Sequence, residues 1–577
     1  MVNRLKLAIK SFFNPELPLF LLGLITAAII CILVAVIFWS TFQQGLPGFR
    51  VDLTLENYRE VLFYPILPRA AKNTLITSVG TVIIACFFAL PIAWLIHRTN
   101  IPYKKFFLTL MFLHVLLPGF LRTMGWIMML SPEIGLINQI LRTFIPVETG
   151  PLSIYNVSSI ALLQGISMTP TLFFMVAGAF AAIDPALEES ALMSGASRLQ
   201  NLGRIVLPLV MPSLIAGLIY AFMTAVSMFE VAALLGRPNN IHVLSTLMYS
   251  AIHTEVGLPN YGAAGVYGVL ILLPTVVALR YYQRMLKESH RFVTVTGKGY
   301  RPRMTDLGKW RNAGTGFIIF YYFIDLFVPF LSILWTSFVP RIQLPSMAAL
   351  STVNLLGYHS AIRMLGEGGV LVNTIGLLAF VGILSVTISL IISWIVLRTH
   401  LPGRYALDTI SMAPHAIPSI AFAFSVAYVS LLIIKQAPFF YGSLAAIILA
   451  DTMRRLPFTT RTISGSFIQI HREFEEAVQI SGGSRVTALR KVIIPLILPA
   501  IFYSFVWAVL HAYREVSIAL FLQSPRNMVI ATSIWQRWQS GETAAAAALG
   551  VIMIVGMGLI ILPLLGAFPH IFGERKL

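Results

Sequence analysis

The chain has 577 residues, of which 57% are hydrophobic and only 11% are charged. Soluble proteins average about 45–50% apolar and roughly 25% charged residues, so this composition argues against a soluble globular fold. Lys and Arg outnumber Asp and Glu by 41 to 23, which gives a net charge of +18. In so apolar a chain, the excess is explained better by cationic loops of a membrane protein than by binding to nucleic acid.

Apolar stretches long enough to cross a hydrocarbon core of about 30 Å recur along the whole chain. They predict an all-α polytopic membrane protein with about twelve transmembrane helices. The expected spans lie near residues 18–42, 74–96, 106–128, 157–183, 205–232, 260–279, 315–338, 372–397, 406–434, 442–465, 493–522 and 544–570. The first run is too long for a signal-peptide core and has no obvious cleavage site, so we expect a retained span. Cys31 and Cys86 lie in separate apolar runs, which excludes a disulfide framework and a cysteine metal cluster.

The distribution of cations predicts the orientation of the chain. With the N-terminus inside, 25 of the Lys and Arg fall in inner segments, 11 in outer loops and 5 within spans. Because positive charge gathers on the cytoplasmic side of membrane proteins, both termini are predicted to be cytoplasmic. The segment 280–311 holds nine Lys and Arg and is predicted to be a solvated cytoplasmic linker.

The second part of the chain repeats the first. Asn73-Thr74 recurs as Asn373-Thr374, and Pro118 as Pro418, at an offset of 300; from Pro170 and Pro457 onward the offset is 287. The difference predicts an insertion in the outer segment 131–151. We therefore expect two homologous six-span halves, residues 1–290 and 291–577, related by a pseudo-two-fold axis along the membrane normal.

A loop pattern recurs between the fourth and fifth spans of each half. The first loop, 184–208, carries Glu189, Ala191, Gly195, Ser197, Arg198 and Pro208; the second, 471–495, carries Glu476, Ala477, Gly482, Ser484, Arg485 and Pro495. Small residues beside the glutamate let a short helix lie against another protein, and the glycine permits a sharp exit from that helix. The proline suits the start of the returning span, where a missing N–H costs little.

This spacing resembles the cytoplasmic coupling loop of ABC importer permeases, which reads Glu-Ala-Ala, three residues, Gly, nine residues, Ile-x-Leu-Pro. The resemblance covers both halves and implies a type I importer-like arrangement in which two ATP-binding subunits dock on the loops and drive alternating access. It also implies an extracytoplasmic solute-binding protein and a bacterial inner (plasma) membrane. The chain has no Gly-x4-Gly-Lys-Ser/Thr phosphate loop, so no cofactor is expected on this chain, and ATP and Mg are expected on the partner ATPase.

Ionisable side chains within predicted spans are costly and are therefore candidates for the substrate pathway. Those candidates are Glu230, Arg454, Arg455, His511, Tyr513, Arg514 and Glu515. The alternative is that they pair within the protein, as Asp451 would with Arg454 or Arg455 at helical spacing. His114 and His415 are expected to be packed histidines, and no spacing specifies a metal site.

The run Arg514-Glu515-Val516-Ser517 resembles the Arg/Lys-Glu-Leu-Ser segment of ferric-iron importer permeases. That resemblance implies ferric iron or an iron complex as the substrate, and the same branch includes permeases for thiamine, putrescine and aminoethylphosphonate. Several arginines at membrane depth suit an iron–anion complex or a phosphonate better than a polyamine.

Two other classes of protein remain open. A proton-coupled secondary transporter also has twelve spans in parallel halves and would use Glu230, His511 and Glu515 as a proton relay. A membrane-embedded enzyme is disfavoured, because no nucleophile–base or metal constellation can be assembled from these spacings. The paired loops favour the permease.

Overall fold

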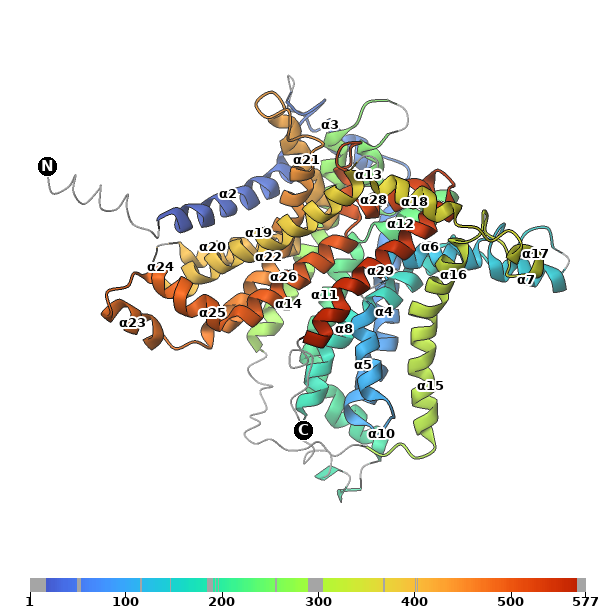
Figure 1. Cartoon of the computed structure of the whole chain (residues 1–577), viewed down its shortest axis with the longest axis horizontal. Helices are drawn as coiled ribbons and strands as arrows, with labels where there is room; N and C mark the ends of the chain where they lie inside the picture. Colours follow the sequence, from blue (N-terminus) through green and yellow to red (C-terminus); the bar gives the residue numbers. More distant parts are fainter. Residues whose placement is uncertain are drawn as a thin grey trace. The chain divides into compact units, whose positions relative to one another are not determined.

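The structure is a computed structural model (Figure 1), and it describes residues 17–48, 53–114, 117–145, 147–183, 190–191, 193–195, 197–254, 257–288, 305–366, 369–399, 401 and 403–567. Within those ranges every regular element is a helix, and the remaining backbone pairing is two isolated β-bridges. Seven described helices are long and apolar enough to cross a membrane, and three bent pairs raise the number to 10 if each pair is one span. The predicted all-α polytopic class is confirmed.

The chain divides into two compact units. Unit 1 comprises Met1–Val61, Ala251–Val269 and Leu365–Thr532; unit 2 comprises Leu62–Ser250, Leu270–Met364 and Ser533–Leu577. These units differ in membership from the sequence halves, because each unit includes the first span of the other half. The halves 1–290 and 291–577 therefore stay a prediction from the repeat.

The helices of unit 1 come mostly from the second half. They are α2 Leu17–Ser40, α3 Glu56–Leu62, the start of α14 Tyr261–Glu288, α19 Val370–Arg398, α20 Arg404–Ala416, α21 Ser419–Leu432, α22 Leu444–Ile468, α23 Glu473–Ile480, α24 Arg485–Ala488, the π-helix η7 Leu489–Ile493, α25 Ile494–Leu496, α26 Leu498–Arg514, α27 Ser517–Phe521 and the start of α28 Ile530–Gln539. In Figure 1, α19, α22 and α26 run side by side, and α23 to α25 lie at one end of them.

The helices of unit 2 come mostly from the first half. They are α4 Leu67–Arg98, α5 Lys104–Leu113, α6 Gly119–Leu130, α7 Leu136–Phe144, α8 Val157–Ala182, α10 Arg198–Asn201, the π-helix η2 Leu202–Val206, α11 Leu207–Ser227, α12 Glu230–Gly236, the 3₁₀ turn η3 Arg237–Asn239, α13 Leu244–Ile252, α15 Trp310–Tyr322, the π-helix η5 Phe323–Phe327, α16 Val328–Thr336, α17 Met347–Leu350, α18 Leu356–Gly366 and α29 Thr543–Ala567. The predicted insertion at 131–151 contains α7, whose Asn138 is fully buried.

Close helix contacts fix each first span in its unit. In unit 1, α2 packs against α20 and α21, and a Cβ on Gly23 would lie 3.0 Å from Cδ1 of Ile395. In unit 2, α16 packs against α6, and a Cβ on Gly125 would lie 2.6 Å from the carbonyl oxygen of Pro329. Glycine at these contacts removes the side chain that would hold the helices apart.

Equivalent hydrogen bonds repeat in the two units. In unit 2, Asn73 donates to the carbonyl of His242 at 3.0 Å, and the hydroxyl of Thr74 accepts from the N–H of Leu244 at 2.9 Å. In unit 1, Asn373 donates to the carbonyl of Met528 at 3.1 Å, and Thr374 accepts from the N–H of Ile530 at 3.0 Å. The sequence repeat therefore corresponds to a repeated local structure.

Four predicted spans are broken rather than continuous. The span expected at 106–128 is split into α5 and α6, and that at 406–434 into α20 and α21; α6 and α21 begin directly after Pro118 and Pro418. A proline disfavours helical backbone at the residue before it, so the helix stops there and restarts. The spans expected at 205–232 and 493–522 end early, and α12 and α27 continue them as short separate helices.

Candidate functional site

The loop 471–495 is built around a capped helix. α23 ends with Gly482 in the left-handed region, at φ +83°, where the N–H of Gly482 donates to Gln479 at 3.0 Å and that of Gly483 to Val478 at 2.9 Å. This is the Schellman arrangement, in which a glycine after the helix satisfies the last carbonyls. Gly195 in the loop 184–208 has φ +86°. Both glycines thus allow the sharp exit that their spacing predicts.

Each loop then restarts as a short capped helix. The Oγ of Ser484 accepts from the N–H of Thr487 at 3.1 Å at the start of α24. In the other loop, Ser197 donates its N–H to the side chain of Gln200 at 2.9 Å and accepts from the N–H of Gln200 at 3.3 Å. Such reciprocal bonds satisfy the free donors of a helix start. Glu189 lies outside the described residues, as does the side chain of Arg198.

Both loops return to the membrane through a π-helical turn. η2 and η7 occupy equivalent positions of the repeat, and each ends two residues before a proline, Pro208 or Pro495. A proline ring would clash with the carbonyl four residues before it, and the wider π turn relieves that clash. The third π-helix in the described chain, η5, stands in the same relation to Pro329.

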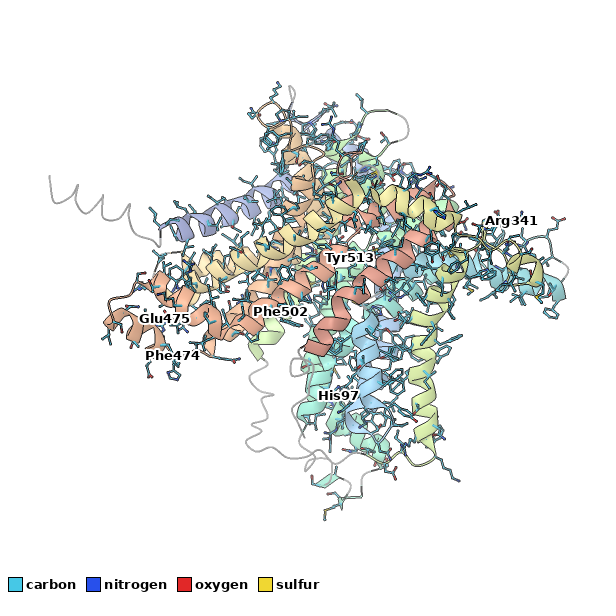
Figure 2. All side chains as sticks on the ribbon, in the orientation of Figure 1. His97, Arg341, Phe474, Glu475, Phe502 and Tyr513 are labelled. Atoms are coloured by element: carbon cyan, nitrogen blue, oxygen red, sulfur yellow. The ribbon has the colours of Figure 1, made fainter. Side chains whose placement is uncertain are left out.

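The exposed surface of the loop 471–495 includes two large apolar side chains. Phe474 is 53% and Ile480 88% exposed, and Glu476 and Ala477 on the same helix are exposed too. An open pocket of about 450 Å³ is lined by Phe474, Ala477, Val478, Ser481, Gly483, Thr487 and Val492. Figure 2 labels Phe474 and Glu475 on this helix. An exposed apolar patch outside the spans is typical of a protein–protein contact.

The loop 471–495 is tied to the end of α19 by an arginine that the sequence analysis did not single out as a site residue. Nε of Arg398 lies 2.9 Å from Oε1 of Glu475, and its Nη2 donates to the carbonyls of Phe467 at 2.9 Å and Ile470 at 2.6 Å. Burial raises the pKa of the Glu475 carboxyl above its ordinary value, and the charge of Arg398 opposes that shift. The sequence signal that could have identified Arg398 is its recurrence, since Arg98 occupies the equivalent position of the first repeat.

Two of the predicted pathway residues of unit 1, Glu515 and His511, contact a third, Arg455. Its Nη2 lies 2.6 Å from Oδ1 of Asp451 and 3.4 Å from Oε2 of Glu515, and it donates to the carbonyl of His511 at 3.1 Å. Glu515 stands at the break between α26 and α27, where its Oε1 accepts from the N–H of Ser517 at 3.1 Å. One arginine thus holds two carboxylates and the end of a broken span.

The other candidates of unit 1 have separate environments. Arg454 donates to the carbonyls of Pro414 and His415 and to Ser419, at the break between α20 and α21. His511 stacks on Trp507 at 4.0 Å between ring centroids. Tyr513 is buried, whereas Arg514 is partly exposed. No group of three His, Cys, Asp or Glu that could hold a metal occurs among the described residues.

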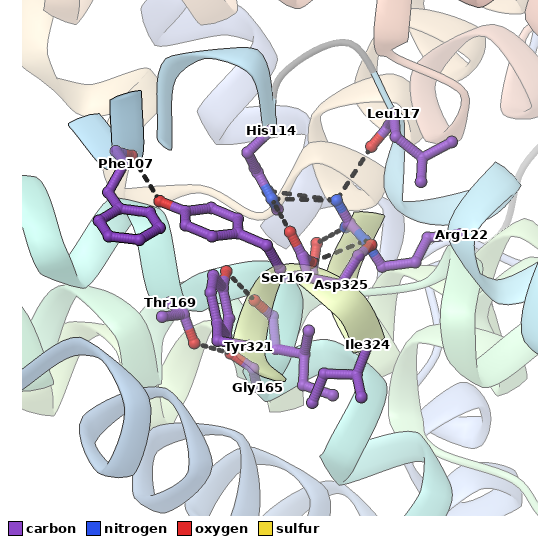
Figure 3. Close-up of polar contacts among 12 residues, drawn as sticks. Phe107, His114, Leu117, Arg122, Gly165, Ser167, Thr169, Tyr321, Ile324 and Asp325 are labelled. Carbon is purple, nitrogen blue, oxygen red and sulfur yellow. Dashed lines mark hydrogen bonds and ion pairs between the residues drawn. The ribbon is translucent and has the colours of Figure 1, made fainter. Parts of the chain in front are cut away.

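Unit 2 contains a buried ion cluster that sequence reasoning recovered only in part. Asp325, in the middle of η5, lies 2.7 Å from Nδ1 of His114 and 2.9 Å from Nε of Arg122, and all three side chains are at most 5% exposed (Figure 3). Arg122 also donates to Ser167 at 2.8 Å and to the carbonyl of Leu117 at 3.2 Å. His114 is thus a paired core histidine, as the sequence predicts. Asp325 was missed because it is a lone acid in an otherwise apolar run.

Glu230 also lies in unit 2. It begins α12, and a Cβ on Gly119 would come within 2.6 Å of its Oε1. Glycine at the start of α6 therefore makes room for the Glu230 carboxylate. Like Glu515, Glu230 stands where a predicted fifth span is interrupted, so both acids are at breaks and not inside continuous helices.

A known protein family matches both parts of the chain. The family described as "Binding-protein-dependent transport system inner membrane component" matches residues 66–289 and again residues 385–568. The two matches together cover more than half of the chain and follow the sequence repeat. The chain belongs to this family. It is a double-length ABC permease, a multi-pass membrane protein and a transport component rather than an enzyme.

Curated relatives of the permease carry different cargoes. The ferric transport system permease protein FbpB of Actinobacillus pleuropneumoniae is 26% identical over 94% of this chain and 76% of its own length. The sulfate transport system permease protein CysT of Salmonella typhimurium is 27% identical over 32% of this chain and 70% of its own. The spermidine/putrescine permease PotB of Haemophilus influenzae is 27% identical over 41% and 82%. FbpB is matched over both halves, and the other two over part of the permease.

Proposed function

We propose that this permease is the membrane subunit of an ATP-driven importer, and that two separate ATP-binding subunits dock on the loops 184–208 and 471–495. The observation that carries the proposal is the repeated loop geometry: a glycine with positive φ, a serine-capped turn and a π-helix before proline, in both repeats. The exposed apolar face of α23 offers a partner Phe474 and the adjoining pocket. Both termini then face the cytoplasm of a bacterial cell, and the permease lies in its inner membrane.

We further propose ferric iron, delivered by a binding protein, as the cargo. The support is the match to a ferric permease over 94% of the chain, together with the Arg514-Glu515-Val516-Ser517 run. Arg454 on α22, partly exposed beside the break between α20 and α21, suits a cargo that arrives with an anion. Sulfate, a polyamine, aminoethylphosphonate and thiamine are the competing solutes.

Cross-linking tests the docking part of the proposal. In a chain whose two native cysteines are replaced, Ala477→Cys should cross-link to a cysteine placed in the docking groove of the cognate ATP-binding subunit. Ser351→Cys, exposed in the predicted outer segment that follows the seventh span, is the matched control and should give no product. Equal yields from both positions would overturn docking at this loop.

Uptake by cells tests the cargo. A strain that lacks the permease should lose uptake of radiolabelled ferric iron and regain it with the wild-type gene, while uptake of sulfate and putrescine stays unchanged. A strain that loses sulfate or putrescine uptake and keeps iron uptake would reject iron and favour that solute. The proton gradient can also be dissipated in cells that keep their ATP. If transport is then lost, the result would favour the secondary transporter.

A further inference from the structure

The C-terminal end of α19 is enclosed by the chain segment that leads into α23. Arg398, the last residue of α19, donates to the carbonyls of Phe467 in the last turn of α22 and of Ile470 just after α22, and it forms an ion pair with Glu475 on α23. In return, Nη2 of Arg472 donates to the carbonyl of Leu397 at 3.2 Å. The end of α19, the end of α22 and the start of α23 are therefore joined through two guanidinium groups.

The contact between Arg398 and Glu475 is built into the protein rather than formed on its surface. The side chains are 7% and 9% exposed. Two neighbouring acids on the same helix, Glu473 and Glu476, are exposed, and Glu473 contacts only the exposed His471, at 3.8 Å. A charge pair excluded from water holds its geometry far better than an exposed pair, which contributes little.

One bond of this connection recurs in unit 2. Arg98 ends α4, as Arg398 ends α19, and its Nη1 donates to the carbonyl of Ile183 at 3.2 Å. Ile183 and Ile470 are equivalent positions of the repeat, and so are Glu188 and Glu475. Glu188 lies outside the described residues. The bond from this arginine to the carbonyl of the equivalent isoleucine before the loop is thus present in both halves.

We propose that Arg398 and Glu475 are positioning residues that transmit movement of the docked ATP-binding subunit from α23 to α19. This inference rests on the proposed function, because it requires a partner on α23. α23 is otherwise connected through the turn 469–472 before it, the Gly482-Gly483 turn after it, and its contacts with α24 and η7. The contacts with α24 and η7 join α23 to its own loop, whereas the Arg398–Glu475 pair joins it to α19. The buried pair makes α19, which packs against α22 and α26, follow α23 directly.

The decisive variant is Glu475→Gln, with Glu473→Gln as its matched control on the same helix. Glutamine keeps the size of the side chain, and Arg398 keeps its bonds to the carbonyls of Phe467 and Ile470, so the variant is expected to fold while losing the ion pair. Two quantities are measured on the permease–ATPase complex in nanodiscs: the ATP-binding subunit retained per permease, and ATP hydrolysis stimulated by the cognate binding protein loaded with ferric iron. We expect retention to be unchanged and stimulation to fall about tenfold in Glu475→Gln, with no change in Glu473→Gln.

Covalent rescue separates coupling from folding. In the cysteine-free background, the double variant Arg398→Cys/Glu475→Cys should be uncoupled, and a short bis-maleimide joining the two cysteines should restore at least half of the stimulation. Equal stimulation in Glu475→Gln and Glu473→Gln would overturn the proposal, as would loss of ATPase retention in parallel with stimulation. If the wild-type permease retains no ATP-binding subunit, or if ATP hydrolysis by the wild-type complex is not stimulated, the proposed function itself fails. That result can be told apart from the variant results, because it appears in the wild-type protein.

Discussion

Single charged residues in this permease are placed where the chain leaves regular helix geometry. Asp325 lies in a π-helix, Glu515 at the break after α26, and Arg454 at carbonyls freed by the break before Pro418. Helix breaks leave backbone groups without partners, and at membrane depth no water replaces them. The side chains of Glu515 and Arg454 bond to such backbone groups, so these two candidates for the pathway also stabilise the helix ends.

Removing Asp325 should destabilise the permease strongly. Asp325→Asn leaves Arg122 buried without its counter-charge, and breaking such a pair costs about 3–5 kcal/mol. The matched control is Glu56→Gln, which removes the exposed partner of Arg59 and should cost less than about 1 kcal/mol. Thermal unfolding in detergent measures both.

A compensating change tests the cause. The double variant Asp325→Leu/Arg122→Met replaces the pair by apolar groups and should regain most of the stability that Asp325→Asn loses. A double variant no more stable than Asp325→Asn would show that the cost comes from packing and not from a stranded charge.

At the scale of elements, the two loops owe their shape to glycine and proline. Gly482→Ala should destabilise the loop by about 1–2 kcal/mol, because alanine resists the positive φ at this position. Gly465→Ala is the control: Gly465 is an exposed helical glycine with no atom within 4 Å of an added Cβ, so alanine there should be neutral or stabilise by about 0.5–1 kcal/mol. Hydrogen exchange of α23 reports the local effect, and equal exchange in both variants would contradict it.

The sequence predicted the helical spans and the two loops better than the breaks within the spans. The spans follow from the length of the apolar runs and the loops from the repeated residue spacing, and both are local patterns. The breaks at Pro118 and Pro418 could not be predicted, because a proline inside an apolar run is compatible with a kink as well as a stop. The partners of Arg122 could not be predicted: Asp325 lies 203 residues away, and no spacing rule relates residues so distant.

For the whole molecule, the orientation in the membrane is a prediction that labelling can test. In a cysteine-free background, Ser351→Cys should react with an impermeant maleimide added to intact spheroplasts, and Lys309→Cys only after the membrane is opened. The expectation follows from the excess of cations in the inner segments. Both positions are exposed in the structure. Labelling of both from the same side would reject the predicted topology.

The buried cluster of unit 2 also imposes a delay during biogenesis, because its charged residues are synthesised at different times. Arg122 enters the membrane long before Asp325 is made, and 203 residues of synthesis separate them. At about 5–20 residues per second, the wait is roughly 10–40 s. During that time the nascent chain carries an arginine at membrane depth with no counter-charge. The insertion machinery must therefore shield an unfinished first half, and a polypeptide that stops before the seventh span is expected to be a substrate for membrane proteases.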